Sequence, residues 1–231
     1  TTRVFFSGLA GAYAIAAAAI EAGAASGTVA ISPPGEALTF ARVGSDVGQR
    51  ALLVLRYENG SVEAVDLSVA LGKPVRDPID AYRELGYEPL LDVASATSPA
   101  ARIVVPARTL TIPVDLGNHH VAAGTNYPEH AGEAGVEDGP FVFAKLVIPS
   151  GPRASVSVGH ALLDYEVELA WVALDDIRDG RPPAEMGVIL CNDYTDRETL
   201  LRNVDVWDIA SGDGFTTGKS FPGYLPVGDL F

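Results

Sequence analysis

From Arg102 to Cys191, the sequence alternates short apolar runs with glycine, proline and asparagine. A β-strand needs only about five residues whereas an average helix has about ten or more, so this pattern is typical of a β-rich fold with few helices. The best helix candidates in this region are residues 128–134, which begin at a proline, and residues 195–203. The apolar runs lie at residues 103–105, 121–123, 141–147, 154–158, 165–173 and 187–191.

The N-terminal part of the chain has a different pattern. Two alternating apolar runs within residues 51–67 flank Asn59-Gly60, a dipeptide favoured in two-residue hairpin turns because both positions accept positive φ. Further on, Asp77-Pro78 has the residue types of a helix start, and Gly86 is typical of a helix end. We therefore predict two regions: residues 1–105, with an N-terminal helix and this hairpin, and residues 106–231.

Residues 4–20 are uncharged and rich in alanine, and Arg3 precedes them. The segment is too short and too rich in small residues to predict a membrane span, and Glu21 interrupts it. Two interpretations remain open. One is a packed Ala-rich helix, which we favour, and the other is a retained export segment that resembles a signal peptide.

The composition restricts the partners and the compartment. Thirty acidic residues against sixteen basic ones give a formal net charge of −14, which argues against nucleic acid and anionic membranes as partners. Cys191 is the single cysteine, so an internal disulfide is impossible and a reducing, cytoplasmic location is expected. One cysteine and four histidines without ligand spacing also argue against a Cys/His zinc site.

Two glutamates lie two residues apart in the predicted strand at residues 165–173. Because side chains alternate faces along a strand, Glu166 and Glu168 are expected to point the same way, while Tyr165 and Val167 point the other. A hard divalent cation can neutralise such a pair through oxygen ligands. From spacing alone, a solvated strand face with two harmless acids is the better interpretation.

A third carboxylate follows the last apolar run. Asp193 stands at the expected end of that strand, just before a helical pattern whose first turn contains Arg197. On local grounds, Asp193 or Thr195 simply caps the helix. In the functional interpretation, Asp193 is a third oxygen ligand and Arg197 points toward the same site.

A histidine and a glutamate lie three residues apart in the helix predicted at residues 128–134. At this spacing His130 and Glu133 share one face, and a carboxylate beside an imidazole fixes its tautomer and raises its basicity. Such a pair can take a proton from water. The alternative is an ordinary ion pair on an exposed helical turn.

Residues 212–220 have some features of a nucleotide-binding P-loop. The motif fails because Asp213 replaces the first required glycine, and because Phe221-Pro222 follow the loop. We therefore exclude nucleotide binding at this loop. Lys219 remains as a cation that can face a substrate oxyanion.

Together and in this order, these segments resemble the fumarylacetoacetate hydrolase family, in its metal-dependent, acylpyruvase-like branch. The matching patterns are G-x-N-Y-x-x-H-x-x-E at residues 124–133, the strand at 141–145, D-Y-E-x-E-L at 164–169, N-D-x-x-x-R at 192–197 and G-K-S-F at 218–221. The hairpin at residues 51–67 is also similar to the small N-terminal domain found in many members.

The resemblance implies an α+β, β-rich fold, in which a small α/β subdomain precedes a mixed β-sandwich or roll that forms the catalytic domain. It further implies a homodimer. Glu166, Glu168 and Asp193 would hold Mg²⁺ or Mn²⁺, with Ca²⁺ as a substitute in crystals.

Members of the family cleave carbon–carbon bonds in 1,3-dicarbonyl substrates such as acylpyruvates, and others decarboxylate, isomerise or dehydrate 2-oxo acids. The resemblance implies that the metal stabilises a developing enolate and that His130, oriented by Glu133, activates water. Lys219 is expected to be a further catalytic residue. The expected substrate contacts are Arg197, Tyr127 and Lys145.

The chain departs from the family pattern at two places. Glu198 and Leu200 replace an aspartate and a substrate-facing glutamine, which puts the recognition pattern in doubt. The chain also stops at Phe231, before the family's T-G-T-P-x-G loop. Three explanations are open: a processed fragment, loss of the C-terminal half, or a separate polypeptide that completes the fold, which we favour. These departures also keep a non-catalytic binding or assembly subunit as an alternative.

Overall fold

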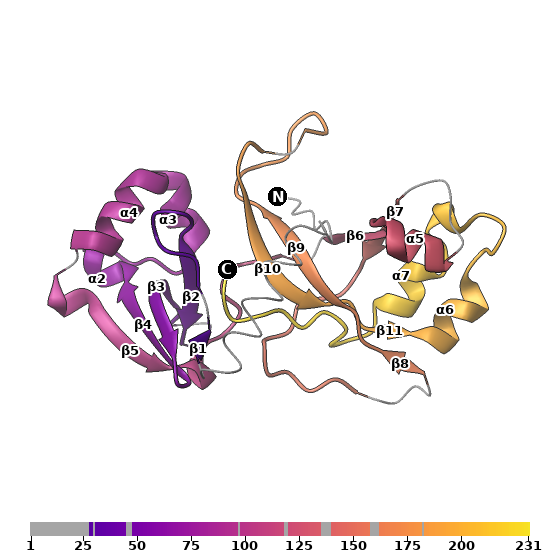
Figure 1. Ribbon diagram of the computed structural model, residues 1–231, viewed down its shortest axis with the longest axis horizontal. Coiled ribbons are helices and arrows are strands. Elements are labelled where there is room, and N and C mark those ends of the chain that lie inside the picture. Colours follow the sequence, from indigo (N-terminus) through magenta and orange to yellow (C-terminus); the bar gives the residue numbers. More distant parts are fainter. Residues whose placement is uncertain are drawn as a thin grey trace. The chain divides into compact units, whose positions relative to one another are not determined.

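The computed structural model describes residues 28–29, 31–44, 48–96, 98–117, 120–134, 140–157, 162–181 and 183–231. Two compact units result, and each is described by itself (Figure 1). The first contains the described residues up to Asp115 together with Asp229–Phe231, and the second contains Leu116–Gly228. Residues 4–20, predicted as a helix or an export segment, lie outside the described part. Among the described residues, no helix has the length and apolar character that crossing a bilayer requires.

The first unit is an antiparallel sheet with helices along one side (Figure 1). β1 and β2 pair with different parts of β3, which pairs with β4, and β4 pairs with β5. The strands are β1 (Thr28–Val29), β2 (Thr39–Val43), β3 (Arg50–Glu58), β4 (Ser61–Asp66) and β5 (Arg102–Pro106). The helices are α2 (Leu67–Leu71), α3 (Pro78–Leu85) and α4 (Tyr87–Ala96), with 3₁₀ turns η1 (Pro99–Ala101) and η2 (Ala107–Thr109).

Both faces of β3 are buried, which makes the sheet the centre of this unit. Leu53 packs in the cluster that contains Leu90 of α4, whereas its neighbour Leu52 packs on the opposite face with Val62. Alternation of side chains along the strand sends successive residues to the two clusters. The C-terminal Phe231 joins the first cluster, and its backbone exchanges two hydrogen bonds with Phe40.

The predicted hairpin is confirmed. Glu58 pairs with Ser61, and Asn59 and Gly60 form the turn with φ of 50° and 71°. Both central residues therefore adopt the positive φ that a tight hairpin turn requires. The predicted helix start and end are confirmed as well, because Asp77 caps α3 and Gly86 ends it.

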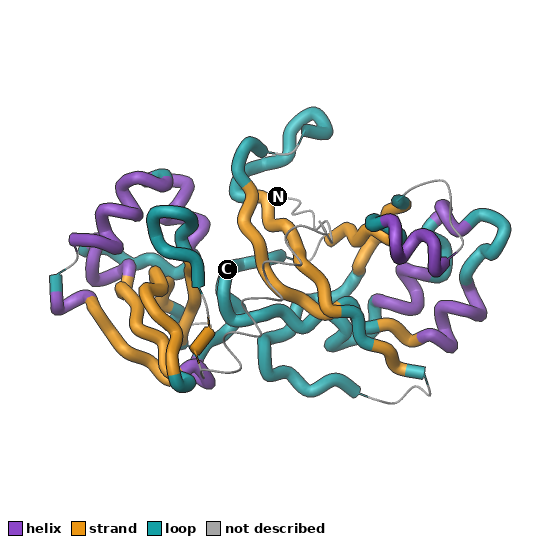
Figure 2. Tube along the Cα trace, viewed as in Figure 1, coloured by secondary structure: helices purple, strands orange, loops and turns teal. Residues whose placement is uncertain are grey.

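The described residues of the second unit form a mixed α and β structure with three antiparallel strand pairs: β6 with β7, β9 with β10, and β8 with β11. Figure 2 shows the long loops that connect these pairs. The strands are β6 (His120–Gly124), β7 (Phe141–Lys145), β8 (Leu163–Asp164), β9 (Val167–Ala173), β10 (Met186–Asn192) and β11 (Thr195–Asp196). The helices are α5 (Pro128–Ala134), α6 (Arg197–Asn203) and α7 (Phe215–Lys219), with the 3₁₀ turn η3 (Ile209–Ser211).

One local prediction for this unit was wrong, and a second was confirmed except at its start. The run at residues 154–157 is a mostly exposed loop, because alternating serines leave it little apolar surface to bury. The helix predicted at residues 195–203 begins at Arg197, since Thr195 and Asp196 pair with β8. Its N-cap is Asp196, whose carboxylate accepts hydrogen bonds from the backbone N–H groups of Glu198 and Thr199.

Asp77 offers a test of how the first unit is held together. One carboxylate oxygen accepts the N–H of Ile79 at 2.9 Å, and the other accepts the N–H of Asp115 at 2.6 Å. We expect Asp77→Ala to lower the free energy of unfolding by about 2–3 kcal/mol, since a helix cap and a buried acceptor are both lost. Urea unfolding measures this, and Asp80→Ala, at an exposed position of the same helix, is the control. An equal loss in both variants would contradict the assignment.

Candidate active site

The register of β9 and β10 brings two of the predicted metal ligands together. Val167 pairs with Asn192, so Glu166, just before β9, lies opposite Asp193, just after β10. The backbone N–H of Asp193 donates to the carbonyl of Glu166 at 2.8 Å, and the N–H of Glu166 donates to Oδ1 of Asn192 at 3.0 Å. The two acidic side chains therefore start from adjoining, hydrogen-bonded backbone.

Lys219, the last residue of α7, joins these two carboxylates. Its Nζ donates to Oε2 of Glu166 and, at 2.8 Å, to Oδ2 of Asp193. The side chain is 4% exposed, and its Nζ lies 5.8 Å from the centre of the Phe143 ring. Oxygen atoms from two strand ends thus converge on one nearly buried ammonium group.

A glycine lets α7 approach close enough for this contact. A Cβ at Gly218 would lie 2.7 Å from Cβ of Leu200 on α6, closer than two such atoms approach. Leu200 itself is 5% exposed. Leu200 is therefore part of the packing that positions Lys219.

Lys145, at the end of β7, supplies a second buried ammonium group. It is 2% exposed, and its Nζ donates to Oδ1 of Asp193 and, at 3.3 Å, to the carbonyl of Tyr194. Asp193 consequently has one lysine on each carboxylate oxygen. This pair was not predicted as such, since Lys145 was expected to contact substrate and lies 48 residues from Asp193 in sequence.

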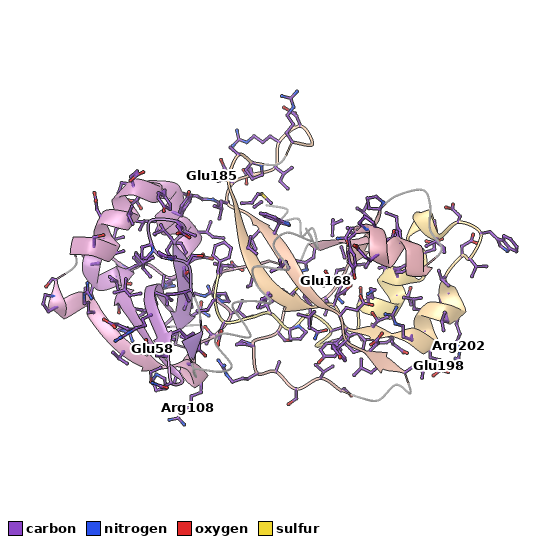
Figure 3. All side chains as sticks on the ribbon, viewed as in Figure 1. Glu58, Arg108, Glu168, Glu185, Glu198 and Arg202 are labelled. Atoms are coloured by element: carbon purple, nitrogen blue, oxygen red, sulfur yellow. The ribbon has the colours of Figure 1, made fainter. Side chains whose placement is uncertain are left out.

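Glu168 projects from β9, two residues after Glu166 (Figure 3). It lines a small cavity of about 30 Å³ that is shared with Asp193 and Lys145. Such a volume holds one water-sized group. The remaining lining residues are His120, Val121, Ala122, Leu169, Ala170, Cys191 and Leu225.

The charges of the site control one another. Burial favours the neutral acid at Asp193, but the ammonium groups of Lys219 and Lys145 outweigh it, and the pKa of this carboxyl lies below its ordinary value. Burial lowers the pKa of Lys145, although Asp193 opposes this effect. Burial also raises the pKa of the Cys191 thiol, and the nearby carboxylates of Asp193 and Glu168 add to the shift. Cys191 is therefore a neutral thiol and not a nucleophile.

The other predicted residues have different environments. Arg197 bonds to Asp164 and Glu166, both within its own unit. Tyr127 is 41% exposed immediately before α5. The backbone of α5 carries His130 and Glu133, whose side chains lie outside the described part of the structure.

Sequence reasoning missed two residues of the cavity, His120 and Cys191. His120 is 3% exposed and is the cross-strand partner of Lys145, so recognising the pairing of β6 with β7 could have identified it. Cys191 is the cross-strand partner of Glu168. Neither residue has a local motif that marks it in the sequence.

The donor chemistry of the site suits a hard divalent cation. Glu166 and Asp193 both direct a carboxylate oxygen at the Lys219 ammonium group, so these oxygens lie close together. Carboxylate oxygens are the ligands that such cations prefer. Within the described ranges, no three acidic, histidine or cysteine side chains form a ready metal cluster. Glu168 lines the cavity beside Asp193 and is the residue that would complete a three-carboxylate set.

Comparison with known proteins agrees with this fold. Residues 119–231 match the family described as fumarylacetoacetate (FAA) hydrolase C-terminal. A fumarylacetoacetate hydrolase from psychrophilic Exiguobacterium antarcticum has a similar structure, with 19% identity and a TM-score of 0.55 over 84% of this chain and 66% of that chain. The chain therefore shares a fumarylacetoacetate hydrolase-like, sheet-rich α+β fold.

A second solved structure is described as a probable 2-hydroxyhepta-2,4-diene-1,7-dioate isomerase from Mycobacterium abscessus. It is 22% identical, with a TM-score of 0.49, and the match covers 84% of this chain and 63% of that chain. The present chain thus spans just under two thirds of the length of both structures. No curated protein matches the chain.

The low pKa of Asp193 predicts a pH-dependent contribution to stability. A carboxyl whose folded pKa is depressed stabilises the protein above its unfolded pKa of about 3.9, and this contribution is lost as pH falls through the folded value. We expect Asp193→Asn to lower the free energy of unfolding at pH 7 by about 3 kcal/mol, because it leaves two buried lysines without their carboxylate. The gap to the wild type should shrink below about pH 4.

Urea unfolding between pH 3 and pH 7, in buffer that contains a chelator, measures this gap. Asp213→Asn, at an exposed position before α7, is the control and should match the wild type throughout. A gap for Asp193→Asn that stays constant over the whole range would contradict the ionised pairing.

Proposed function

We propose that this chain is an enzyme of the fumarylacetoacetate hydrolase family, a divalent-metal-dependent hydrolase that cleaves a carbon–carbon bond in a 1,3-dicarbonyl substrate such as an acylpyruvate. The observation that carries the proposal is the convergence of Glu166 and Asp193 on the Lys219 ammonium group, within the residues that match the family. Preorganised charges with little access to water suit a reaction in which negative charge develops on a substrate oxygen.

In this proposal, Glu166, Glu168 and Asp193 hold Mg²⁺ or Mn²⁺. Carboxylate oxygens are the ligands that these cations prefer. The burial of Glu166 and Asp193 beside Lys145 and Lys219 supports the assignment. Acidic side chains on an ordinary solvated strand face would not contact buried lysines. When bound, the cation would act as a Lewis acid on the substrate's carbonyl oxygens.

The lysines of the site suit an anionic 2-oxo acid. Lys219 and Lys145 are both nearly buried, and electrostatic attraction is stronger where water is excluded. Lys219 is assigned to the oxygen on which negative charge develops, and Lys145 keeps Asp193 in place and borders the cavity that a substrate group would enter. Tyr127 is a further candidate for substrate contact.

Water activation is assigned to α5. In this assignment, an imidazole nitrogen of His130 takes a proton from the water that attacks the distal carbonyl carbon, and Glu133 orients the ring. The proton then passes to the carbon that leaves as the enolate of the second product. The overall reaction consumes one water and releases two carbonyl compounds.

The buried position of Leu200 favours one alternative with the same site. Since this residue cannot offer the hydrogen bond of the family's glutamine, the substrate can differ, and the reaction can be decarboxylation, isomerisation or dehydration of a 2-oxo acid. Product analysis separates the two proposals: hydrolysis yields two carbonyl acids and decarboxylation yields carbon dioxide. The alternative of a non-catalytic binding or assembly subunit predicts that Glu166 faces bulk solvent, but this side chain is half-buried.

The proposal also includes a homodimer in the cytoplasm, with residues 106–231 as the catalytic region. Light scattering of the purified chain tests the oligomeric state. A monomer at micromolar concentration would contradict that part without affecting the proposed chemistry.

Glu168 provides the first test of the proposed metal site. With Mg²⁺ and an acylpyruvate, we expect Glu168→Ala to reduce turnover by about 100-fold or more, because a metal ligand is lost. Glu185→Ala, at an exposed position near the start of β10, is the matched control (Figure 3). Undiminished turnover in Glu168→Ala would reject the proposed role.

His130 tests the proposed base independently of the metal. We expect His130→Ala to lower kcat by about 10²–10⁴-fold, the usual contribution of general base catalysis, while Mn²⁺ affinity stays at the wild-type value. Glu133→Gln should give a smaller loss of the same kind. Wild-type kcat in His130→Ala would exclude it as the base, and a loss of Mn²⁺ binding would make it a ligand instead.

A further inference from the structure

Asp164 and Arg197 come together where two short strands pair. β8 pairs with β11, with Asp164 opposite Thr195, and the backbone N–H of Arg197 donates to the carbonyl of Leu162 at 3.0 Å. The Nε of Arg197 donates to Oδ2 of Asp164 at 2.9 Å, and its Nη2 lies 2.8 Å from the same oxygen. The backbone pairing thus brings the guanidinium group to Asp164.

The same guanidinium group holds Glu166. The Nη2 of Arg197 donates to Oε1 of Glu166, and the hydroxyl of Thr195 donates to that oxygen at 3.3 Å. The other oxygen, Oε2, accepts from Lys219. Because the backbone of Glu166 is also bonded to Asn192 and Asp193, its carboxylate has a fixed direction.

The position of Arg197 in α6 is not explained by the stability of that helix. Arg197 is the first residue of α6, and a cation is unfavourable at a helix N-terminus, which carries partial positive charge. Arg202, in the last turn, is at the favourable end and pairs with Glu198 along the exposed helix surface. The two carboxylates that Arg197 faces account for its position better than the helix does.

We propose that Arg197 is a positioning residue that acts through Glu166, and that Asp164 fixes its guanidinium group. This inference rests on the proposed function, because a fixed Glu166 matters most if it binds a metal ion. A planar guanidinium group can engage two carboxylates at once, whereas the single ammonium group of a lysine acts as a point charge. Removal of residues that orient metal ligands typically costs about 10–100-fold in metal affinity.

Mn²⁺ affinity without substrate separates a positioning role from substrate contact. Calorimetry on the full chain compares the wild type with Arg197→Gln and Arg197→Lys, and with Arg202→Gln as the matched control from the same helix. We expect both Arg197 variants to bind Mn²⁺ about 10–100-fold more weakly and Arg202→Gln to match the wild type. Wild-type Mn²⁺ affinity in Arg197→Gln, with a raised KM for an acylpyruvate, would overturn the inference.

Asp164 is tested by its dependence on Arg197. Asp164→Ala should weaken Mn²⁺ binding less than Arg197→Gln does. The double variant should be hardly weaker than Arg197→Gln alone, because both changes disable one unit. If the two losses multiply in full, Asp164 acts independently and its part of the proposal fails.

If the wild-type chain binds no Mn²⁺, the proposed function is rejected. The contact between Arg197 and Glu166 is then tested by thermal unfolding in the absence of metal. Melting temperatures in chelator compare Arg197→Gln, Glu166→Gln and the double variant. Contacting residues should give a double loss smaller than the sum of the single losses. A fully additive loss would overturn the inference, and Arg197→Lys replaces Arg197→Gln if the latter does not fold.

Discussion

The antiparallel register of β9 and β10 is the constraint on which the candidate site depends. Buried Ala170 and Val172 on one strand, and Ile189 on the other, fix this register through the apolar face that they share. A shift by one residue would turn every side chain to the opposite face of the hairpin. The position of Glu166 opposite Asp193 is thus a consequence of apolar packing further along the same strands.

The site has an electrostatic character that the whole protein lacks. The chain carries a formal net charge of −14, yet Lys145, Lys219 and Arg197 gather around the acidic residues of the second unit. Two of these cations are nearly buried, and burial of a charge is tolerated only when partners compensate for lost hydration. The net charge of the chain therefore bears on binding to nucleic acid or membranes, but it does not predict the cluster of cationic side chains at this site.

Local signals in the sequence were sufficient where the structure is decided locally. The Asn59-Gly60 turn and the Asp77 cap depend on a few adjacent residues, and both were predictable. The start of α6 was not, because Asp193, Thr195 and Asp196 are all good caps and the pairing of β11 with β8 decides among them. The Lys145–Asp193 pair was also out of reach, since it joins strands from different sheets.

The two faces of residues 165–168, at the start of β9, also show the limit of local signals. Alternation predicted that Tyr165 and Val167 would point away from the glutamates, but it did not say which face is enclosed. In the structure, Tyr165 and Val167 are exposed, while Glu166 and Glu168 are partly buried. Burial depends on which other elements cover each face, and that information is not local. The catalytic and metal-binding roles of the predicted residues remain predictions.

The close packing of Gly218 on Leu200 links two positions in different helices. A side chain at position 218 would push α7 away from α6 and move Lys219 with it. A change at position 200 therefore acts on a helix that it does not belong to, and its effect depends on whether α7 can follow. A glutamine at position 200 would keep the Cα and Cβ atoms that Gly218 faces, so the close approach of the two helices restricts position 218 to glycine but leaves the outer part of the side chain at position 200 free to change.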